Sequence, residues 1–377
     1  MYETMSGVQY PSYVNNKDVC FKHDRNKIKL QFLSDWSKVE ASMNTLTPTD
    51  ICAMYFPPRL EIQYDQGTED RLVHDICQWP FVKFLSPSLF TVALDWSRFC
   101  SGQHQLSYER KVLLHRHFAW VFLMDEVSEK LPIYKLHTTA GRIYLDNLKS
   151  IMRDGQVEDM TQFKGACPDE VIESALLAQR ILAEDLMPLK RKLLSPHHLQ
   201  ACIDTLDLYF DYQYEEGHRF CAEQASEDIL KTRSFTISAL TPMLLCMTPS
   251  QAGIYRPDDP CLIQISLFIA LFNDIAGLFK DIDSLKTQDD GSAYLNLVYV
   301  AMNEQGLSEE ASIRVYANRL NQFTRHYEYF LPTYPPLRQQ LYHDMLKFCF
   351  GYYDYHLVGI QGKPNNRYGW KREKIID

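Results

Sequence analysis

The chain has 377 residues, of which 46% are hydrophobic and 13% aromatic, with only 15 glycines. This length and composition suit a large packed core and exclude an intrinsically disordered chain. The net charge is −9. A nucleic-acid binder would need a basic surface, so we expect no nucleic-acid partner.

The ten cysteines include no CxxC pair and no zinc-like spacing, and most lie in apolar stretches. We therefore predict that the cysteines are reduced residues in the core of an intracellular protein. The N-terminal stretch is polar and aromatic, without the apolar run of a signal peptide. No segment reaches a membrane-spanning length free of charge, so we expect a cytoplasmic protein with no membrane span.

In chain order, residues 1–26 read as an irregular N-terminal arm, followed by a single α-helical domain over residues 27–377. Residues 28–41 and 49–54 look like short helical pieces, and no stretch shows convincing strand periodicity. Helical periodicity dominates after Pro57-Pro58. The fold class that we predict is all-α, a single large helical bundle.

A long helix predicted over residues 107–130 carries acids at its C-terminal end, with Asp125 and Glu129 four residues apart. Acids at that end oppose the helix dipole, which is tolerable if they hold a metal ion. For the acids alone, a solvated helix end is the plainer interpretation. Phe118 and Phe122 count against it, because they lie on nearly the same face and make that face apolar.

Arg233 precedes hydroxyl side chains and the Thr241-Pro242 step, a pattern that predicts an interrupted helix. A guanidinium at such a break can direct its fork at a phosphate group. A lone arginine is more often a surface residue, so this interpretation depends on the motifs on either side.

The most informative stretch is residues 271–281, where Asn273, Gly277 and Asp281 recur at i, i+4 and i+8 on one helix face. An amide and a carboxylate oxygen with room for water suit Mg²⁺ better than a soft metal. Residues 261–272 are almost wholly apolar and predict a buried helix. Its polar stripe must then face a cavity. Residues 283–292, which follow, read as a polar loop.

These features, with Arg367-Tyr368 near the C-terminus, resemble the class I terpene synthases (terpene cyclases) of the microbial type. The acidic cluster matches the pattern D(D/E)xx(D/E). Residues 273–281 match the pattern ND-apolar-x-(S/T/G)-xxx-(E/D). Arg233 stands where the family has its diphosphate-sensing arginine, and Arg367-Tyr368 where it has its RY pair. The four marks keep the family's order over residues 118–368.

The resemblance implies the isoprenoid synthase fold and a linear prenyl diphosphate substrate, with farnesyl diphosphate favoured and geranylgeranyl diphosphate next. It implies a Mg²⁺ cofactor of three ions, cyclisation to a terpene hydrocarbon or alcohol with release of diphosphate, and a monomer or homodimer. It assigns catalysis to Asp125, Asn273, Asp281 and Arg233, metal binding to Asp125, Glu129, Asn273 and Asp281, diphosphate binding to Arg233, Lys280, Arg367 and Tyr368, and the pocket lining to Phe118, Phe122, Ile269 and Tyr355. Aromatic faces would stabilise the carbocation, with Tyr352 as a further candidate.

Within the motif at residues 273–281, two positions depart from the family pattern. Gly277 stands where serine or threonine is commonest, so a water would replace that hydroxyl at the metal. Asp281 replaces the usual glutamate and is one methylene shorter, which would loosen the metal.

Two alternatives remain. A chain-elongating prenyl diphosphate synthase of the same fold would show a second DDxxD motif at residues 273–281. A non-catalytic helical binding protein would not be expected to keep Arg233, Lys280 and Arg367. Diphosphate release that depends on Mg²⁺ separates an enzyme from such a binding protein.

Overall fold

The computed structural model describes residues 18–44, 51–55, 66–101, 104–130, 139–219, 226–288, 291–360, 368 and 370–373. Helices dominate this part of the chain, which confirms the predicted fold class. The α-helices in chain order are α1 (Trp36–Met43), α2 (Gln66–Cys77), α3 (Pro87–Ser101), α4 (Tyr108–Lys130), α6 (Thr139–Met152), α7 (Asp169–Ile181), α8 (Met187–Leu193), α9 (Pro196–Arg219), α10 (Ser226–Thr236), α11 (Leu240–Cys246), α12 (Pro249–Ile254), α13 (Pro260–Gln288), α14 (Leu297–Gln305), α15 (Glu309–Phe330) and α16 (Pro336–Ile360).

Shorter turns of helix join these elements. They are 3₁₀ turns at Val82–Phe84, Met160–Phe163, Gly291–Leu295 and Leu331–Thr333, and a π-helical turn at Leu182–Leu186. The π turn joins α7 to α8 and ends at Leu186, and Pro188 is the second residue of α8. Proline has no N–H to donate and crowds the preceding turn, and the wider π turn absorbs this mismatch.

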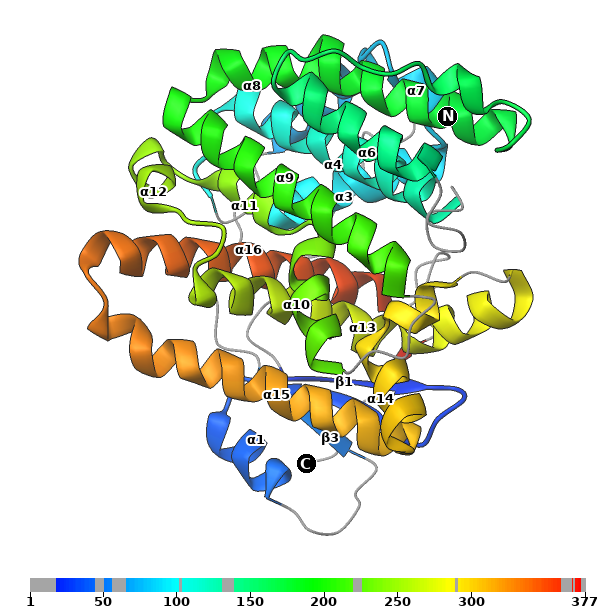
Figure 1. Ribbon diagram of the computed structural model, residues 1–377. Coiled ribbons are helices and arrows are strands. Elements are labelled where there is room, and N and C mark those ends of the chain that lie inside the picture. The colour runs from blue at the N-terminus through cyan, green and yellow to red at the C-terminus, as the bar shows by residue number, and fades with distance from the viewer. Residues whose placement is uncertain are drawn as a thin grey trace.

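Helix α13 is the central element and packs against α10, α14, α15 and α16. Figure 1 shows α16 crossing the middle of the molecule, with α3, α4 and α6 to α9 on one side and α15 on the other. By length and composition α13 could cross a membrane over Pro260–Thr287, yet 83% of its apolar window is buried inside the protein. Such burial is what the core helix of a packed bundle shows.

Helix α13 runs further than the sequence indicates. Residues 283–288, which we expected to begin a loop, continue the helix to Gln288. The polar side chains of residues 283–287 are half-buried or exposed, and an exposed polar face is compatible with helix as well as with a loop. Lys280 and Asp281 therefore lie inside a helix, two turns before its end.

The predicted interruption after Arg233 is confirmed. Helix α10 ends at Thr236, and α11 begins at Leu240 after Ala239, its N-cap. Ser238 between them has φ of 54°, in the left-handed region that a helix cannot continue through.

Our expectation of no strands is wrong, because a four-stranded sheet lies against the bundle. Its strands β1 (Val19–His23), β2 (Lys29–Leu33), β3 (Ile51–Tyr55) and β4 (Trp370–Glu373) are arranged in the order β3-β2-β1-β4. Strand β1 pairs antiparallel with β2 and β4, while β2 and β3 are parallel. Part of the expected irregular arm is thus strand β1, and parts of the two expected helical pieces are β2 and β3. The division into an arm and one domain stays a prediction.

The strands escaped detection because each is short and the pairing is non-local. Within the strands, burial alternates at residues 29–32, where Leu30 and Phe32 are buried and Lys29 and Gln31 are half-buried, and at residues 21–23, but both runs are short. Strand β4 comes from the other end of the chain. The sheet packs on α13 through Trp370, whose indole N–H donates to the Ala276 carbonyl at 3.0 Å. On α15, Asn321 bonds to both Tyr55 and Ala53 and so covers the free edge of β3.

Candidate active site

A cavity of about 360 Å³ opens between α3, α4, α9, α10, α13 and α16. Eight of the predicted site residues line it: Asp125, Arg233, Asn273, Lys280, Asp281, Phe118, Phe122 and Tyr352. They come from four helices, α4, α10, α13 and α16, that are distant in sequence. The tertiary structure therefore brings the acidic, amide and arginine motifs to one place.

Arg233 is held by an ion pair that the sequence analysis missed. Its Nη2 lies 2.9 Å from Asp274 Oδ1, and Asp274 is completely buried. The other carboxylate oxygen of Asp274 accepts the Leu297 N–H at 3.0 Å. Burial lowers the pKa of Arg233, but Asp274 and Glu216 outweigh this and raise it overall. Asp274 follows Asn273 directly in the sequence, so the sequence could have indicated it as a site residue. Burial of the Asp274 carboxyl raises its pKa.

Glu216 on α9 is a second missed residue of the site. It is 2% exposed, lines the cavity and accepts a hydrogen bond from the Thr236 hydroxyl at 2.7 Å. Its Oε1 is 4.0 Å from Arg233 Nη1. Burial raises its pKa to about 7, although Arg233 and Thr236 act in the opposite direction. Nothing in the local sequence of a long polar helix distinguishes this glutamate from its neighbours.

The polar stripe of α13 faces the cavity as the sequence predicts. Asn273 Oδ1 accepts a hydrogen bond from the Tyr352 hydroxyl at 2.8 Å. Asp281 Oδ1 lies 3.3 Å from Lys280 Nζ, and Asp281 Oδ2 accepts from Asn296 Nδ2 at 2.9 Å. These contacts hold both oxygen-bearing side chains in defined orientations.

Asn296 connects this stripe to the next helix. Its Nδ2 also donates to the Asp274 carbonyl at 2.9 Å, while its Oδ1 caps α14 by accepting from Val298 and Tyr299. The N-cap role could have been read from the sequence. The contact with Asp281 could not, because it depends on how α14 packs on α13.

The donor set at the cavity fits a hard divalent cation. Asp125, Asn273 and Asp281 offer only oxygen atoms, which Mg²⁺ prefers. Within the residues that the structure describes, no three His, Cys, Asp or Glu side chains form a metal cluster by themselves. Mg²⁺ usually keeps several waters and binds through one or two carboxylates plus substrate phosphates, so a sparse donor set of this kind is compatible with it.

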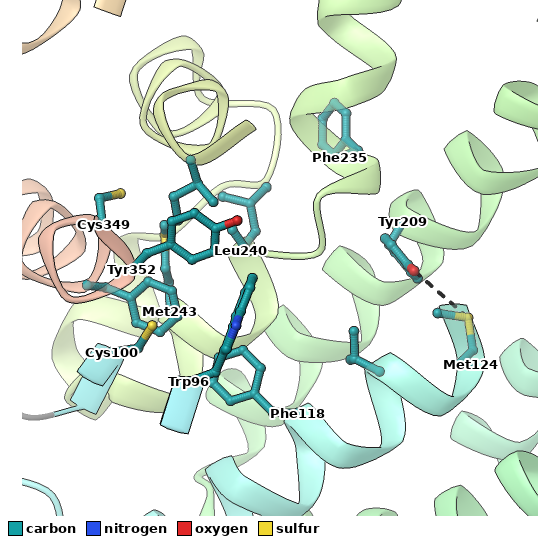
Figure 2. Close-up of a cluster of buried hydrophobic side chains, with 14 of the residues drawn as sticks. Trp96, Cys100, Phe118, Met124, Tyr209, Phe235, Leu240, Met243, Cys349 and Tyr352 are labelled. Atoms are coloured by element: carbon teal, nitrogen blue, oxygen red, sulfur yellow. Dashed lines mark hydrogen bonds between the residues drawn. The ribbon is translucent and has the colours of Figure 1, made fainter. Parts of the chain in front are cut away.

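Aromatic rings make up another part of the cavity. Trp96 on α3, missed by the sequence analysis, stands between Phe118 and Tyr352 (Figure 2). Its ring centroid is 4.4 Å from that of Tyr352, 5.0 Å from Phe122 and 5.6 Å from Phe118. Such a group of ring faces can stabilise a cation that has no other partner.

A close approach of two helices creates this aromatic group. A Cβ added to Gly351 on α16 would lie 2.1 Å from the Phe99 carbonyl oxygen on α3. Only glycine permits the two backbones to come this close. Tyr352, the next residue, is thereby set against Trp96.

Tyr209 and Gln213 of α9 add polar groups to the lining. Gln213 Nε2 donates to the Tyr209 hydroxyl at 3.0 Å, and that hydroxyl donates to the Met124 sulfur at 3.9 Å (Figure 2). Burial raises the pKa of Tyr209 well above its ordinary value, so the phenol stays neutral.

The other predicted site residues lie elsewhere or outside the described part. Ile269 is 1% exposed and packs in the core. Tyr355 is half-buried, with its ring 5.5 Å from that of Trp96. Tyr368 is 4% exposed and packs in the same core. None of the three is among the described residues that line the cavity. Arg367 and the Glu129 side chain are outside the described residues, so all these assignments stay predictions.

Comparison with known proteins identifies the family. A scan against models of protein families finds no match. Over 362 residues the chain is 46% identical to a (+)-bicyclogermacrene synthase of Penicillium expansum, covering 96% of this chain and 92% of that protein. Among solved structures, 2-methylisoborneol synthase of Streptomyces coelicolor with Mg²⁺ and 2-fluoroneryl diphosphate aligns with a TM-score of 0.59, at 15% identity over 80% of this chain and 94% of that one.

A second solved structure, germacradien-4-ol synthase of Streptomyces citricolor, aligns with a TM-score of 0.54, at 13% identity over 77% of this chain and 93% of that one. At these identities the solved structures show the fold alone, which is the all-α isoprenoid synthase fold. The 46% identity to the Penicillium expansum synthase, over nearly the whole chain, shows the family as well as the fold. The chain belongs to the class I terpene synthase family and is a terpene cyclase.

Proposed function

We propose that this terpene cyclase ionises a linear prenyl diphosphate and cyclises the carbocation, with farnesyl diphosphate favoured and geranylgeranyl diphosphate next. The observation that supports this most is that Asp125, Asn273 and Asp281 line one cavity with Arg233 and an aromatic group. The Penicillium expansum relative is named for bicyclogermacrene, a sesquiterpene, which favours the fifteen-carbon diphosphate. We also propose a cytoplasmic enzyme that acts as a monomer or homodimer.

Magnesium is the proposed cofactor, with three ions held by Asp125, Glu129, Asn273 and Asp281. The all-oxygen donor set supports this, as does the Mg²⁺ present in the Streptomyces coelicolor structure. When bound, magnesium supplies charge neutralisation for the leaving diphosphate. Asn273 and Asp281 contribute their oxygens from a rigid helix, and the Tyr352 and Asn296 contacts hold them in place.

Three basic side chains, Arg233, Lys280 and Arg367, would bind the diphosphate directly, together with the hydroxyl of Tyr368. Arg233 and Lys280 each lie beside a carboxylate, at 2.9 Å and 3.3 Å. A guanidinium positioned in this way forms charge-assisted hydrogen bonds with phosphate oxygens without first being ordered.

The aromatic group would act on the hydrocarbon part of the substrate. A carbocation reacts with any water that reaches it, so its surroundings must be dry and shaped. Trp96, Phe118, Phe122 and Tyr352 offer ring faces, each worth roughly 0.5–2 kcal/mol to a nearby cation.

The proposal is tested by incubating the enzyme with the C10, C15 and C20 prenyl diphosphates and Mg²⁺, with products analysed by gas chromatography and mass spectrometry. Asp125→Asn and Asn273→Ala should lower turnover by orders of magnitude with unchanged helicity, since the first removes the negative charge of a metal-binding carboxylate and the second removes an oxygen ligand. Asp146→Asn, on the exposed face of α6, is the matched control and should behave as the unsubstituted enzyme.

The outcomes are distinct. A cyclic C15 product formed only with Mg²⁺ supports the full proposal, and a cyclic C20 product alone would move the substrate to geranylgeranyl diphosphate. A longer linear diphosphate made in the presence of isopentenyl diphosphate would indicate a chain-elongating enzyme. Undiminished turnover in EDTA would overturn the proposed mechanism.

A further inference from the structure

The Tyr352 side chain joins the two halves of the cavity. Its ring belongs to the aromatic group, at 4.4 Å from Trp96 and an interplanar angle of 84°. Its hydroxyl belongs to the polar half, where it donates to Asn273 Oδ1 at 2.8 Å. Tyr352 is completely buried, whereas Asn273 is half-buried and faces the cavity.

The position of this tyrosine is fixed by packing. The close approach of α16 to α3 at Gly351 places the Tyr352 backbone, and the Trp96 ring then limits where the phenol can turn. A buried side chain held in this way presents its hydroxyl in one direction. Asn273 is half-buried, and without a partner its terminal amide could rotate between two orientations.

A hydrogen bond from Tyr352 breaks that symmetry. In the structure the hydroxyl donates to the amide oxygen, so Oδ1 and not the NH₂ group lies next to the phenol. An amide oxygen has two lone pairs, so one remains for a cation while the other accepts the hydrogen bond. Groups that orient a metal ligand in this way commonly change metal affinity by 10- to 100-fold.

We infer that Tyr352 is a positioning residue that presents Asn273 Oδ1 to the metal ion through its hydroxyl, and that its ring serves the hydrocarbon pocket separately. The inference rests on the proposed function, because it takes Asn273 to be a metal ligand. It assigns two roles to one side chain, and these roles can be separated by removing the hydroxyl and keeping the ring.

The test compares Tyr352→Phe with Tyr353→Phe. Tyr353 is the next residue on α16 and is also buried. Its ring stacks on Phe268 and lies tilted against Phe272, and it is not among the described residues that line the cavity. Metal binding is measured directly, as Mn²⁺ bound in the presence of inorganic diphosphate, by electron paramagnetic resonance. The Mg²⁺ dependence of kcat/KM and the product distribution are measured alongside.

For Tyr352→Phe we expect about tenfold or greater weakening of Mn²⁺ binding, a matching rise in the Mg²⁺ needed for half-maximal rate, and an unchanged product distribution. Tyr353→Phe should leave all three as in the unsubstituted enzyme. Equal Mn²⁺ binding by both variants would overturn the inference, as would a changed product distribution without a changed metal affinity. Failure of the unsubstituted enzyme to bind Mn²⁺ with diphosphate would instead overturn the proposed function, so the two failures are distinguishable.

Discussion

The carboxylate of Asp281 lies directly beside the Cα of Gly277. A Cβ built on Gly277 would be 3.3 Å from Asp281 Oδ2, closer than most side chains tolerate. The two departures from the family pattern are therefore one structural feature, in which the absent side chain at residue 277 leaves room for the carboxylate of residue 281.

This relationship predicts that substitutions at the two positions are coupled. Gly277→Ser should crowd the Asp281 carboxylate, disturb its 2.9 Å contact with Asn296 and raise the Mg²⁺ requirement. Asp281→Glu alone should leave the Mg²⁺ requirement unchanged or lower it, because the longer side chain compensates for the looser metal binding expected of the shorter aspartate. The double variant restores the commoner Ser and Glu pair, so its Mg²⁺ requirement should be lower than the two single effects predict. Simple additivity in this double-mutant cycle would contradict the coupling.

Glu216 gives a prediction about pH and stability. Its pKa is raised from 4.5 to about 7 by burial, with Arg233, Thr236, Asp125 and Asp274 as the groups that face it. A carboxyl with a raised folded-state pKa holds its proton more tightly when folded, so it costs nothing below pH 4.5. The cost of ionising it in a buried site grows as the pH rises from 4.5 to about 7.

Glu216→Gln should remove this cost of ionisation, which is worth roughly 3 kcal/mol of folding stability at about 1.4 kcal/mol for each unit of pKa. The free energy of unfolding, measured in urea at pH 5 and pH 8, should then depend less on pH than in the unsubstituted protein. Glu215→Gln, at the exposed neighbouring position, is the matched control. The same pH dependence in Glu216→Gln and in the unsubstituted protein would show that Glu216 is not the titrating group.

Lys190 on α8 predicts a pH dependence of stability opposite to that of Glu216, because the cost of burying its charge falls as the pH rises. It is 1% exposed, and its amine has no hydrogen-bond partner within the described residues. Burial lowers its pKa from 10.5 to about 8, with Cys202 acting weakly the other way. Above pH 10.5 the amine is neutral in both states and costs nothing. The cost develops as the pH falls from 10.5 to about 8 and is fully present at pH 7.

Lys190→Met should therefore raise the free energy of unfolding at pH 7 by up to roughly 3 kcal/mol, because it removes a buried amine and keeps the apolar stem. Thermal unfolding followed by circular dichroism measures this effect. Lys192→Met, at an exposed position on the same helix, should change little. A less stable Lys190→Met protein would mean that the amine has a favourable partner.

Gly351 predicts a packing effect that reaches the cavity. In Gly351→Ala the new methyl group would collide with the Phe99 carbonyl oxygen, so α3 and α16 must separate. We expect a loss of about 1–3 kcal/mol or more in stability, together with an altered product distribution because Tyr352 moves away from Trp96. Gly253→Ala in α12, where a Cβ meets nothing within 4 Å, is the control and should be neutral. Equal stability of the two variants would contradict the close approach of the helices.

Local sequence was informative wherever a pattern repeats along one helix. Asn273 and Asp281 share a helix face whatever the rest of the fold does, and the apolar run before them requires burial. The break after Arg233 could also be predicted, since hydroxyl residues and Pro242 disfavour a continuous helix there. The strands could not, because β1 and β4 acquire partners only when the two ends of the chain meet.

The sequence by itself determined the helical class, the family and three separate stretches that carry the cavity's acids, amide and arginine. These depend on interactions within a few residues, which a linear pattern records. Only the tertiary structure decided which partners those groups have: Asp274 and Glu216 for Arg233, Tyr352 for Asn273, and Asn296 for Asp281. Each of these contacts joins residues on different elements, and its geometry is set by how closely the helices pack.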